Sequence, residues 1–204
     1  MRHRSFIIAL ALFAFIAAPG HAQDSYQTEA DRLAVLLNWH SGSVVGEIGA
    51  GHGQMTLAAA KAVGPTGRVY STELDPKLLA NLESLAQTTK SITAVKAAEA
   101  ETNLPEGSCD SIFMRLVYHH LTKPVEIDAS LFRSLKPGGL LAVIDEEPPP
   151  GSTRVEGVPE NRGGHGVPQK ILIEEVTSAG FQLVKAQNDW PDKDYCVVFR
   201  KPST

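Results

Sequence analysis

The feature that most constrains the fold is a regular alternation of short apolar runs and helix-forming stretches after about residue 26. Strands that are apolar on both faces need helices on both sides, so the pattern favours a doubly wound, mostly parallel α/β sheet. The turn-forming residues 188–192 (NDWPD) join the last two runs and predict that the last of the strands is antiparallel. The expected strands are 44–49, 68–74, 92–96, 111–117, 140–145, 181–185 and 195–199, and the expected helices are 26–39, 54–63, 76–88, 124–135 and 168–179.

The first 22 residues do not belong to this pattern. A basic start at residues 2–4 precedes an uninterrupted apolar run over 6–18, then Pro19 and the small-x-small triplet Gly20-His21-Ala22. This arrangement predicts a secretory signal peptide over 1–22, because the apolar run is short for a membrane span. We therefore expect an exported domain over 23–204 with no stable membrane insertion. An uncleaved N-terminal membrane anchor is the alternative.

Composition narrows the classes of protein that fit. The 204 residues suit one domain, and 43% hydrophobic with 21% charged residues excludes a disordered tail or a disulfide scaffold. A net charge of −4 gives no broad basic surface, so nucleic acid is not an expected partner. The two cysteines, Cys109 and Cys196, are expected to be buried thiols rather than a disulfide. No His/Cys cluster has zinc spacing, so no metal site is predicted.

The strongest local motif is Glu47-Ile48-Gly49-Ala50-Gly51-His52-Gly53, which runs from the first strand into a helix. Alternating glycines let the chain turn tightly and let a ligand approach main-chain atoms beside the positive end of the helix dipole. The dinucleotide fingerprint Gly-x-Gly-x-x-Gly needs glycine where this chain has Gln54. The compressed spacing, with an acid two residues before the first glycine, indicates a different cofactor.

With five further segments, this motif resembles the class I S-adenosylmethionine-dependent methyltransferases, from about residue 28 to residue 201. The segments are Glu73 at the end of the second strand, 98–105 after the third, 110–113 at the start of the fourth, His119-His120-Leu121 after the fourth, and Leu135–Leu140 before the fifth. The resemblance implies a Rossmann-like methyltransferase fold and S-adenosyl-L-methionine as cofactor.

The resemblance also assigns cofactor-binding residues. It implies that Glu47 lies near the methionine amino group, that Glu73 accepts hydrogen bonds from the ribose hydroxyls, and that Glu99 meets the adenine amino group. The full expected set is Glu47, Gly49, Gly51, His52, Gly53, Glu73, Glu99 and Arg115. His52 is equally consistent with an exposed loop residue.

Methyl transfer from a sulfonium is an in-line displacement, in which the enzyme aligns the acceptor and excludes water. One general base suffices if the acceptor must lose a proton. The catalytic candidates are His119, His120, His165 and Glu146, beside the ends of the fourth and fifth strands or in the segment that follows. In much of the family a similar His-His pair serves the fold alone. His165 could be an exposed loop histidine, and Glu146 could bind a cationic group.

Residues 146–168 are rich in proline and glycine, and a segment of this length without periodicity is typical of an active-site lid or a disordered loop. The domain carries no large insertion, which favours a small-molecule methyl acceptor. The small-molecule branch of the family that resembles this chain includes ubiquinone-biosynthesis-type and other broad methyltransferases, whose acceptors vary widely. The alternative function is a non-catalytic module that binds S-adenosylmethionine or a nucleoside. An aminopropyl transferase is disfavoured, because Tyr118-His119-His120 stand where acidic polyamine-binding residues are expected.

Overall fold

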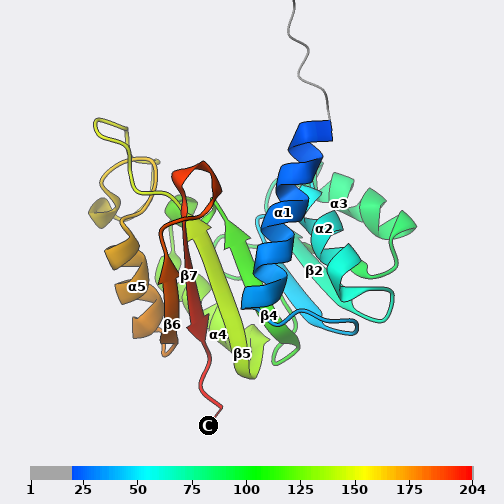
Figure 1. The fold of residues 1–204 in the computed structure, drawn as a ribbon. Coiled ribbons are helices and arrows are strands. Elements are labelled where there is room, and N and C mark those ends of the chain that lie inside the picture. Colours follow the sequence, from blue (N-terminus) through cyan, green and yellow to red (C-terminus); the bar gives the residue numbers. More distant parts are fainter. Residues whose placement is uncertain (1–19, 204) are drawn as a thin grey trace, which may run out of the picture.

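The computed structural model describes residues 20–203, and its centre is a mixed seven-stranded sheet of order β3-β2-β1-β4-β5-β7-β6 (Figure 1). The first five strands in this order, β3, β2, β1, β4 and β5, are each parallel to their neighbours. Strand β7 is antiparallel to both β5 and β6. The elements are α1 (Gly20–Leu36), β1 (Val44–Ile48), α2 (Gln54–Val63), β2 (Arg68–Glu73), α3 (Pro76–Thr88), β3 (Ile92–Lys96), β4 (Cys109–Arg115), α4 (Pro124–Ser134), β5 (Leu135–Asp145), α5 (Gln169–Ser178), β6 (Gln182–Gln187) and β7 (Tyr195–Arg200), with short 3-10 turns η1 (Tyr118–His120), η2 (Glu160–Arg162) and η3 (Pro191–Lys193).

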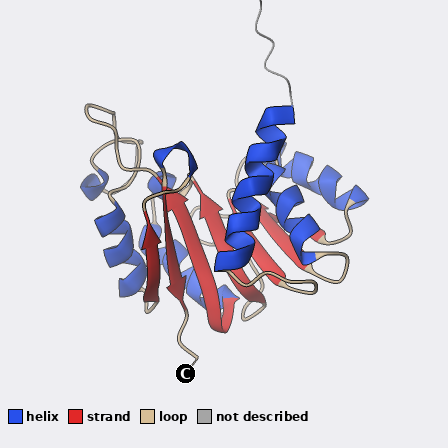
Figure 2. Cartoon of the chain, in the orientation of Figure 1, coloured by secondary structure: helices blue, strands red, loops and turns tan. Residues whose placement is uncertain are grey.

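Two hydrophobic cores lie on the two faces of the sheet, and helices cover both (Figure 2). Side chains alternate along each strand, so Phe113 of β4 packs in the core with α1 and α2, while Ile112 and Met114 pack with α4 and α5. The predicted doubly wound sheet with an antiparallel last strand is confirmed.

The largest differences from the expected elements are at α1 and β5. The helix α1 covers Gly20–Leu36 rather than 26–39, and Asn38, with a φ of 55°, follows its end. Strand β5 begins at Leu135 rather than at residue 140, because Leu135 pairs with Cys109 across a register shift. The expected leader falls largely on residues 1–19, which lie outside the described residues. No described helix is long and apolar enough to cross a membrane.

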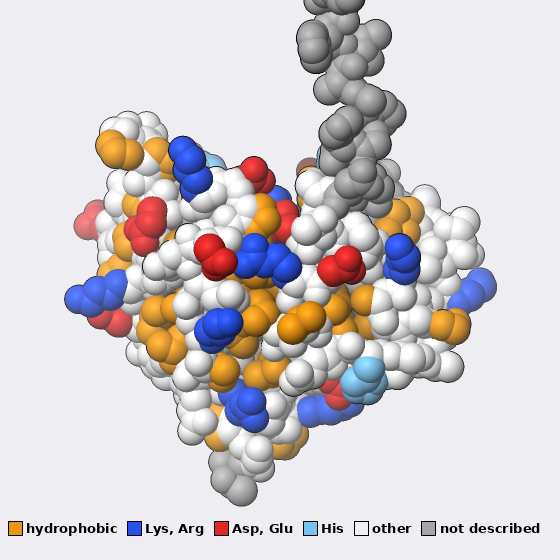
Figure 3. Space-filling model, viewed as in Figure 1, with side chains coloured by type: hydrophobic (Ala, Val, Ile, Leu, Met, Phe, Trp, Pro, Cys, Tyr) orange, Lys and Arg blue, Asp and Glu red, His pale blue; other side chains and the backbone are white. Residues whose placement is uncertain are grey.

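Both cysteines, Cys109 on β4 and Cys196 on β7, are buried and free. On the face shown in Figure 3, basic and acidic side chains are interspersed with apolar ones. This face therefore carries no continuous basic stripe of the kind that binds a nucleic-acid backbone.

Candidate active site

Two adjoining cavities lie at the edge of the sheet where the parallel strands β1, β2, β4 and β5 end. One, of about 240 Å³, extends past Glu73 to Glu99 and His120. The other, of about 230 Å³, lies between the glycine loop and Arg115. Ile48 and Gly49 line both, so the cavities meet at the end of β1. Ligands of open α/β sheets bind at this edge, where the strand order reverses.

The glycine loop needs its glycines for shape and for space. Gly49, Gly51 and Gly53 have φ angles of 66°, 55° and 83°, in the region that favours glycine. A Cβ at Gly49 would lie 2.7 Å from Val117 Cγ2, and one at Gly53 would lie 2.5 Å from Leu85 Cδ1. The loop therefore packs closely on one side while its backbone and His52 face the second cavity.

Glu73 fixes the loop against the end of β2. Its Oε2 accepts a hydrogen bond from the Gly51 amide at 2.9 Å, and its Oε1 accepts from the amides of Leu74 and Asp75 at 2.7 and 3.0 Å. Glu73 also lines the first cavity, beside the position where the resemblance places the ribose. The carboxylate thus links the first cavity to the loop conformation.

Glu47 is buried in the second cavity, with 4% of its surface exposed. Its Oε2 accepts hydrogen bonds from Thr56 Oγ1 at 2.5 Å and from Ser71 Oγ at 3.4 Å. Burial raises the pKa of Glu47 to about 8, against the opposing effect of these two hydroxyls. The raised pKa favours the protonated form of this carboxyl near neutral pH.

Arg115 closes the other side of the second cavity and joins three distant segments. Its Nε donates to both carboxylate oxygens of Glu29 on α1, at 3.1 and 2.9 Å, and Trp190 Nε1 donates to the same carboxylate at 3.1 Å. The guanidinium carbon lies 5.5 Å from the ring centre of Tyr26. The resemblance placed Arg115 in the site, but the sequence gave no indication of Glu29 or Tyr26. Both lie on α1, where the sequence pattern indicates only an apolar face.

Glu99 lines the first cavity from the segment after β3. Its carboxylate accepts a hydrogen bond from Thr122 Oγ1 at 2.8 Å and lies 3.6 Å from Lys123 Nζ. The hydrogen bond from Thr122, followed by the charge of Lys123, lowers the pKa of Glu99. Glu101 also lines this cavity, but its carboxylate is engaged by Ser130 and Arg133. Both acids therefore line the first cavity with their carboxylates partnered, and the resemblance assigns the adenine contact to Glu99.

Beyond the first cavity, His119 is held firmly by Asp145, the last residue of β5. Asp145 Oδ1 lies 2.7 Å from His119 Nδ1, and Oδ2 accepts a hydrogen bond from the His119 amide at 3.1 Å. Both side chains are almost completely buried. The neighbouring His120 lines the cavity, and burial together with the charges of His119 and His165 lowers its pKa.

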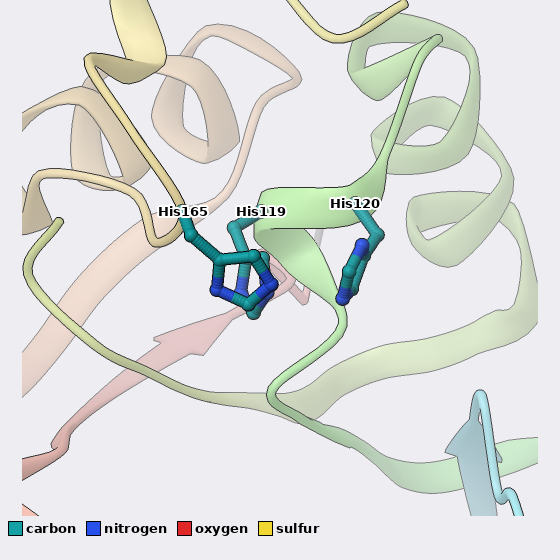
Figure 4. Close-up of side chains that lie close together, drawn as sticks. All are labelled: His119, His120 and His165. Atoms are coloured by element: carbon teal, nitrogen blue, oxygen red, sulfur yellow. The ribbon is translucent and has the colours of Figure 1, made fainter. Parts of the chain in front are cut away.

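His165 comes from the segment 146–168 and lies against this pair (Figure 4). Its ring centre is 4.4 Å from that of His119 and 5.3 Å from that of His120. Its Nδ1 lies 3.5 Å from Glu146 Oε1. The structure thus brings together all four residues proposed for catalysis. The sequence spacing predicted no metal site, yet one ligand atom from each histidine lies within 4.8 Å of the others.

The segment 146–168 is packed on the molecule through Arg162. This side chain is fully buried, its Nη2 lies 2.8 Å from Glu175 Oε2 on α5, and its guanidinium carbon lies 4.9 Å from the ring centre of Tyr118. Near the segment's end, the Val167 amide donates to the Glu146 carbonyl at 3.0 Å. These contacts hold His165 over the ends of β4 and β5.

Residues 46–143 match the family described as the methyltransferase domain. This match covers a little under half of the 204-residue chain. Over 109 residues it is 29% identical to the ubiquinone/menaquinone biosynthesis C-methyltransferase of Burkholderia mallei, a match that covers 53% of this chain and 45% of that enzyme. The chain thus matches less than half the length of this curated relative.

Solved structures share the fold of the methyltransferase domain. An S-adenosylmethionine-dependent methyltransferase from Aquifex aeolicus has a TM-score of 0.72 at 19% identity, with 90% of this chain and 93% of that chain covered. A phosphoethanolamine N-methyltransferase from Haemonchus contortus, in complex with S-adenosyl-L-methionine, has a TM-score of 0.64 at 16% identity, covering 84% of this chain and 52% of that chain. The predicted fold is confirmed, and the match over residues 46–143 supports the predicted enzyme class and cofactor.

Proposed function

We propose that this methyltransferase domain transfers a methyl group in line from S-adenosylmethionine to a small-molecule acceptor. The observation that carries the proposal is the pair of cavities that meet at Ile48 and Gly49. One cavity offers the acids expected for ribose and adenine, and the other offers Glu47 and Arg115 for the polar methionine end. A single cofactor bound across Gly49 would occupy both.

The acceptor is proposed to approach from the histidine side of the first cavity, where His120 lies in its wall. His119, His120, His165 and Glu146 would then face the acceptor rather than the cofactor. The mixed charges of the visible face and the absence of a large insertion support a small molecule over a nucleic acid. The ubiquinone-type relative is named for a C-methyltransferase activity, which is consistent with such an acceptor.

Calorimetry of the full chain with S-adenosylmethionine tests the cofactor site. We expect Glu73→Gln to weaken binding by roughly tenfold or more, because an amide cannot replace a charged acceptor for the ribose hydroxyls and the Gly51 amide. Glu83→Gln, an exposed residue on α3, is the matched control and should bind as the wild type does. Failure to bind millimolar cofactor, or equal affinity in both variants, would contradict the site.

Turnover separates the enzyme from a binding module. Incubation with labelled S-adenosylmethionine and a metabolite extract should yield S-adenosylhomocysteine and a labelled small product. Tight binding without any product, across extracts from several sources, would favour the non-catalytic module.

We also propose that residues 1–22 direct export. The proposal rests on the basic start, the short apolar run and the small-residue triplet. Mass spectrometry of the chain recovered after secretion should find Gln23 at its N-terminus. Recovery of the intact chain in the membrane fraction would favour the anchor instead.

A further inference from the structure

The histidine cluster contains a buried nitrogen with nothing bound to it. His119 has 1% of its side chain exposed, and its Nδ1 is occupied by Asp145 at 2.7 Å. Its Nε2 has no hydrogen-bond partner within the part of the chain that the structure describes. Because the carboxylate favours the proton on Nδ1, Nε2 presents a lone pair toward the cluster. A buried acceptor without a partner destabilises the folded protein, unless a donor or a metal ion binds to it.

Two further imidazoles converge on the same place. The ring centres of His119 and His120 are 4.1 Å apart, and those of His119 and His165 are 4.4 Å apart. One ligand atom from each of the three rings lies within 4.8 Å of the others. Figure 4 shows that His119 and His120 come from the turn after β4, whereas His165 reaches in from the segment 146–168.

Consecutive carboxylates at the end of β5 orient two of the three rings. Asp145 holds Nδ1 of His119, and Glu146 lies 3.5 Å from Nδ1 of His165. A carboxylate behind the distal nitrogen is the usual partner of a metal-binding histidine, because it fixes the tautomer and makes the other nitrogen a better ligand. The two carboxylates therefore act behind the rings rather than as direct ligands.

We propose that His119, His120 and His165 form a binding site for a divalent first-row transition-metal ion of the zinc type. Three imidazoles match the ligand preference of zinc and not that of magnesium or calcium, which require oxygen ligands. Tetrahedral coordination at a Zn–N distance of about 2.0–2.1 Å brings ligand nitrogens to about 3.4 Å from one another. The two exposed rings, His120 and His165, can close this gap while His119 stays fixed.

The location of the site gives the ion a specific place in the molecule. His120 lines the first cavity, so the ion would lie on the acceptor side of the cofactor. Three protein ligands leave a coordination position for water or for an oxygen or sulfur atom of the acceptor. Such an ion lowers the pKa of the group bound to it, and the histidines then serve as ligands rather than as separate bases.

Zinc titration of the full chain, without a histidine tag and stripped by a chelator, tests the site directly. We expect one zinc per chain with a micromolar or lower Kd. His120→Gln and His165→Gln should each weaken binding at least tenfold, and Asp145→Asn should weaken it by about 10- to 100-fold. His40→Gln, which removes an exposed histidine far along the chain from the cluster, should bind zinc as the wild type does.

Two further measurements keep the result unambiguous. The thermal unfolding of each metal-free variant establishes that it is folded, and cobalt(II) in place of zinc should give the absorption bands of a tetrahedral nitrogen-ligated ion. Failure of the wild type to bind zinc below about 100 µM, or equal zinc affinity in wild type and both histidine variants, would overturn the proposal. Because binding is measured without methyl transfer, such a failure would leave the proposed function standing.

Discussion

At the scale of single residues, the carboxyl of Glu47 is unusual because it is buried in the second cavity. Burial raises its pKa to about 8, compared with 4.5 for a solvated glutamate. Below pH 4.5 the carboxyl is protonated in both folded and unfolded chains, so it contributes no pH dependence there. Between pH 4.5 and 8 only the unfolded chain loses the proton, so stability falls as the pH rises, and above pH 8 the difference is constant.

We therefore expect Glu47→Gln to remove part of the pH dependence of stability. Between pH 5 and pH 8 the cofactor-free wild type should lose on the order of 3 kcal/mol relative to this variant. Urea unfolding at a series of pH values measures the difference, with Glu83→Gln as the control that should follow the wild type. Parallel stability curves for wild type and Glu47→Gln would contradict the buried, protonated state.

The same carboxyl predicts a proton released on cofactor binding. If the cofactor ammonium lies beside Glu47, its positive charge lowers the pKa of the carboxyl and expels the proton. At pH 7 we expect up to one proton released per S-adenosylmethionine bound, measured as the dependence of the calorimetric enthalpy on the buffer. Glu47→Gln should release none. Identical proton counts in the two proteins would place the ammonium elsewhere.

At the scale of elements, the segment 146–168 depends on one buried cation. Arg162 is fully buried against Glu175 and Tyr118, and it lies three residues before His165. Tyr118 in turn donates hydrogen bonds to Asp128 at 2.8 Å and to Glu175 at 3.0 Å. Apart from the short turn η2, the segment forms no helix or strand, and the side chain of Arg162 attaches it to α5.

We expect Arg162→Leu to lower the free energy of unfolding by about 3 kcal/mol, because it leaves the Glu175 carboxylate without its cation. The variant should also be cleaved faster by proteases within 146–168. Arg154→Leu is the matched control, since Arg154 is an exposed residue of the same segment. Equal unfolding energies and cleavage rates in the two variants would show that Arg162 does not hold the segment.

The helices and strands also differ in how far their bounds are determined by local sequence. The sequence predicted α2, α3 and β3 with the bounds that the structure has, because apolar spacing and a proline at the first helical position, Pro76, are local signals. It placed the start of β5 too late, because Leu135 enters the sheet by pairing with Cys109 of another strand. No local pattern reports such a pairing.

The candidate site divides in the same way. The proposed cofactor residues Glu47 and Glu73 follow from motifs at strand ends, where the fold fixes their positions. The histidine cluster does not, because His165 reaches His119 through tertiary contacts of the segment 146–168, such as those of the buried Arg162. Glu29 was missed for a related reason, since it is a buried acid whose partners, Arg115 and Trp190, lie far away in sequence.

At the scale of the whole molecule, the cofactor should stabilise the fold as a unit. Its expected contacts join the glycine loop, β2 and, through Arg115 and Glu29, the helix α1. At a ligand concentration of about 100 times the Kd, binding adds about 2.7 kcal/mol to the unfolding free energy. For a chain of this size that corresponds to a rise in Tm of about 5–10 °C.

Thermal unfolding with increasing S-adenosylmethionine measures this shift, and adenosine alone should give a smaller one. Glu73→Gln should need more cofactor for the same rise in Tm, whereas Glu83→Gln should follow the wild type. A Tm that does not change at millimolar cofactor would contradict cofactor binding by the folded chain.

The strand order has a consequence for how the chain reaches its native state. Strand β7 lies between β5 and β6, yet both of these are made before it during synthesis. Until residues 195–200 emerge from the ribosome, β5 and β6 each expose an unpaired edge, and unpaired edges can join strands of other nascent chains. The newly made protein is therefore most vulnerable to aggregation in the interval between synthesis of β6 and insertion of β7, which makes this interval the point at which a chaperone would help most.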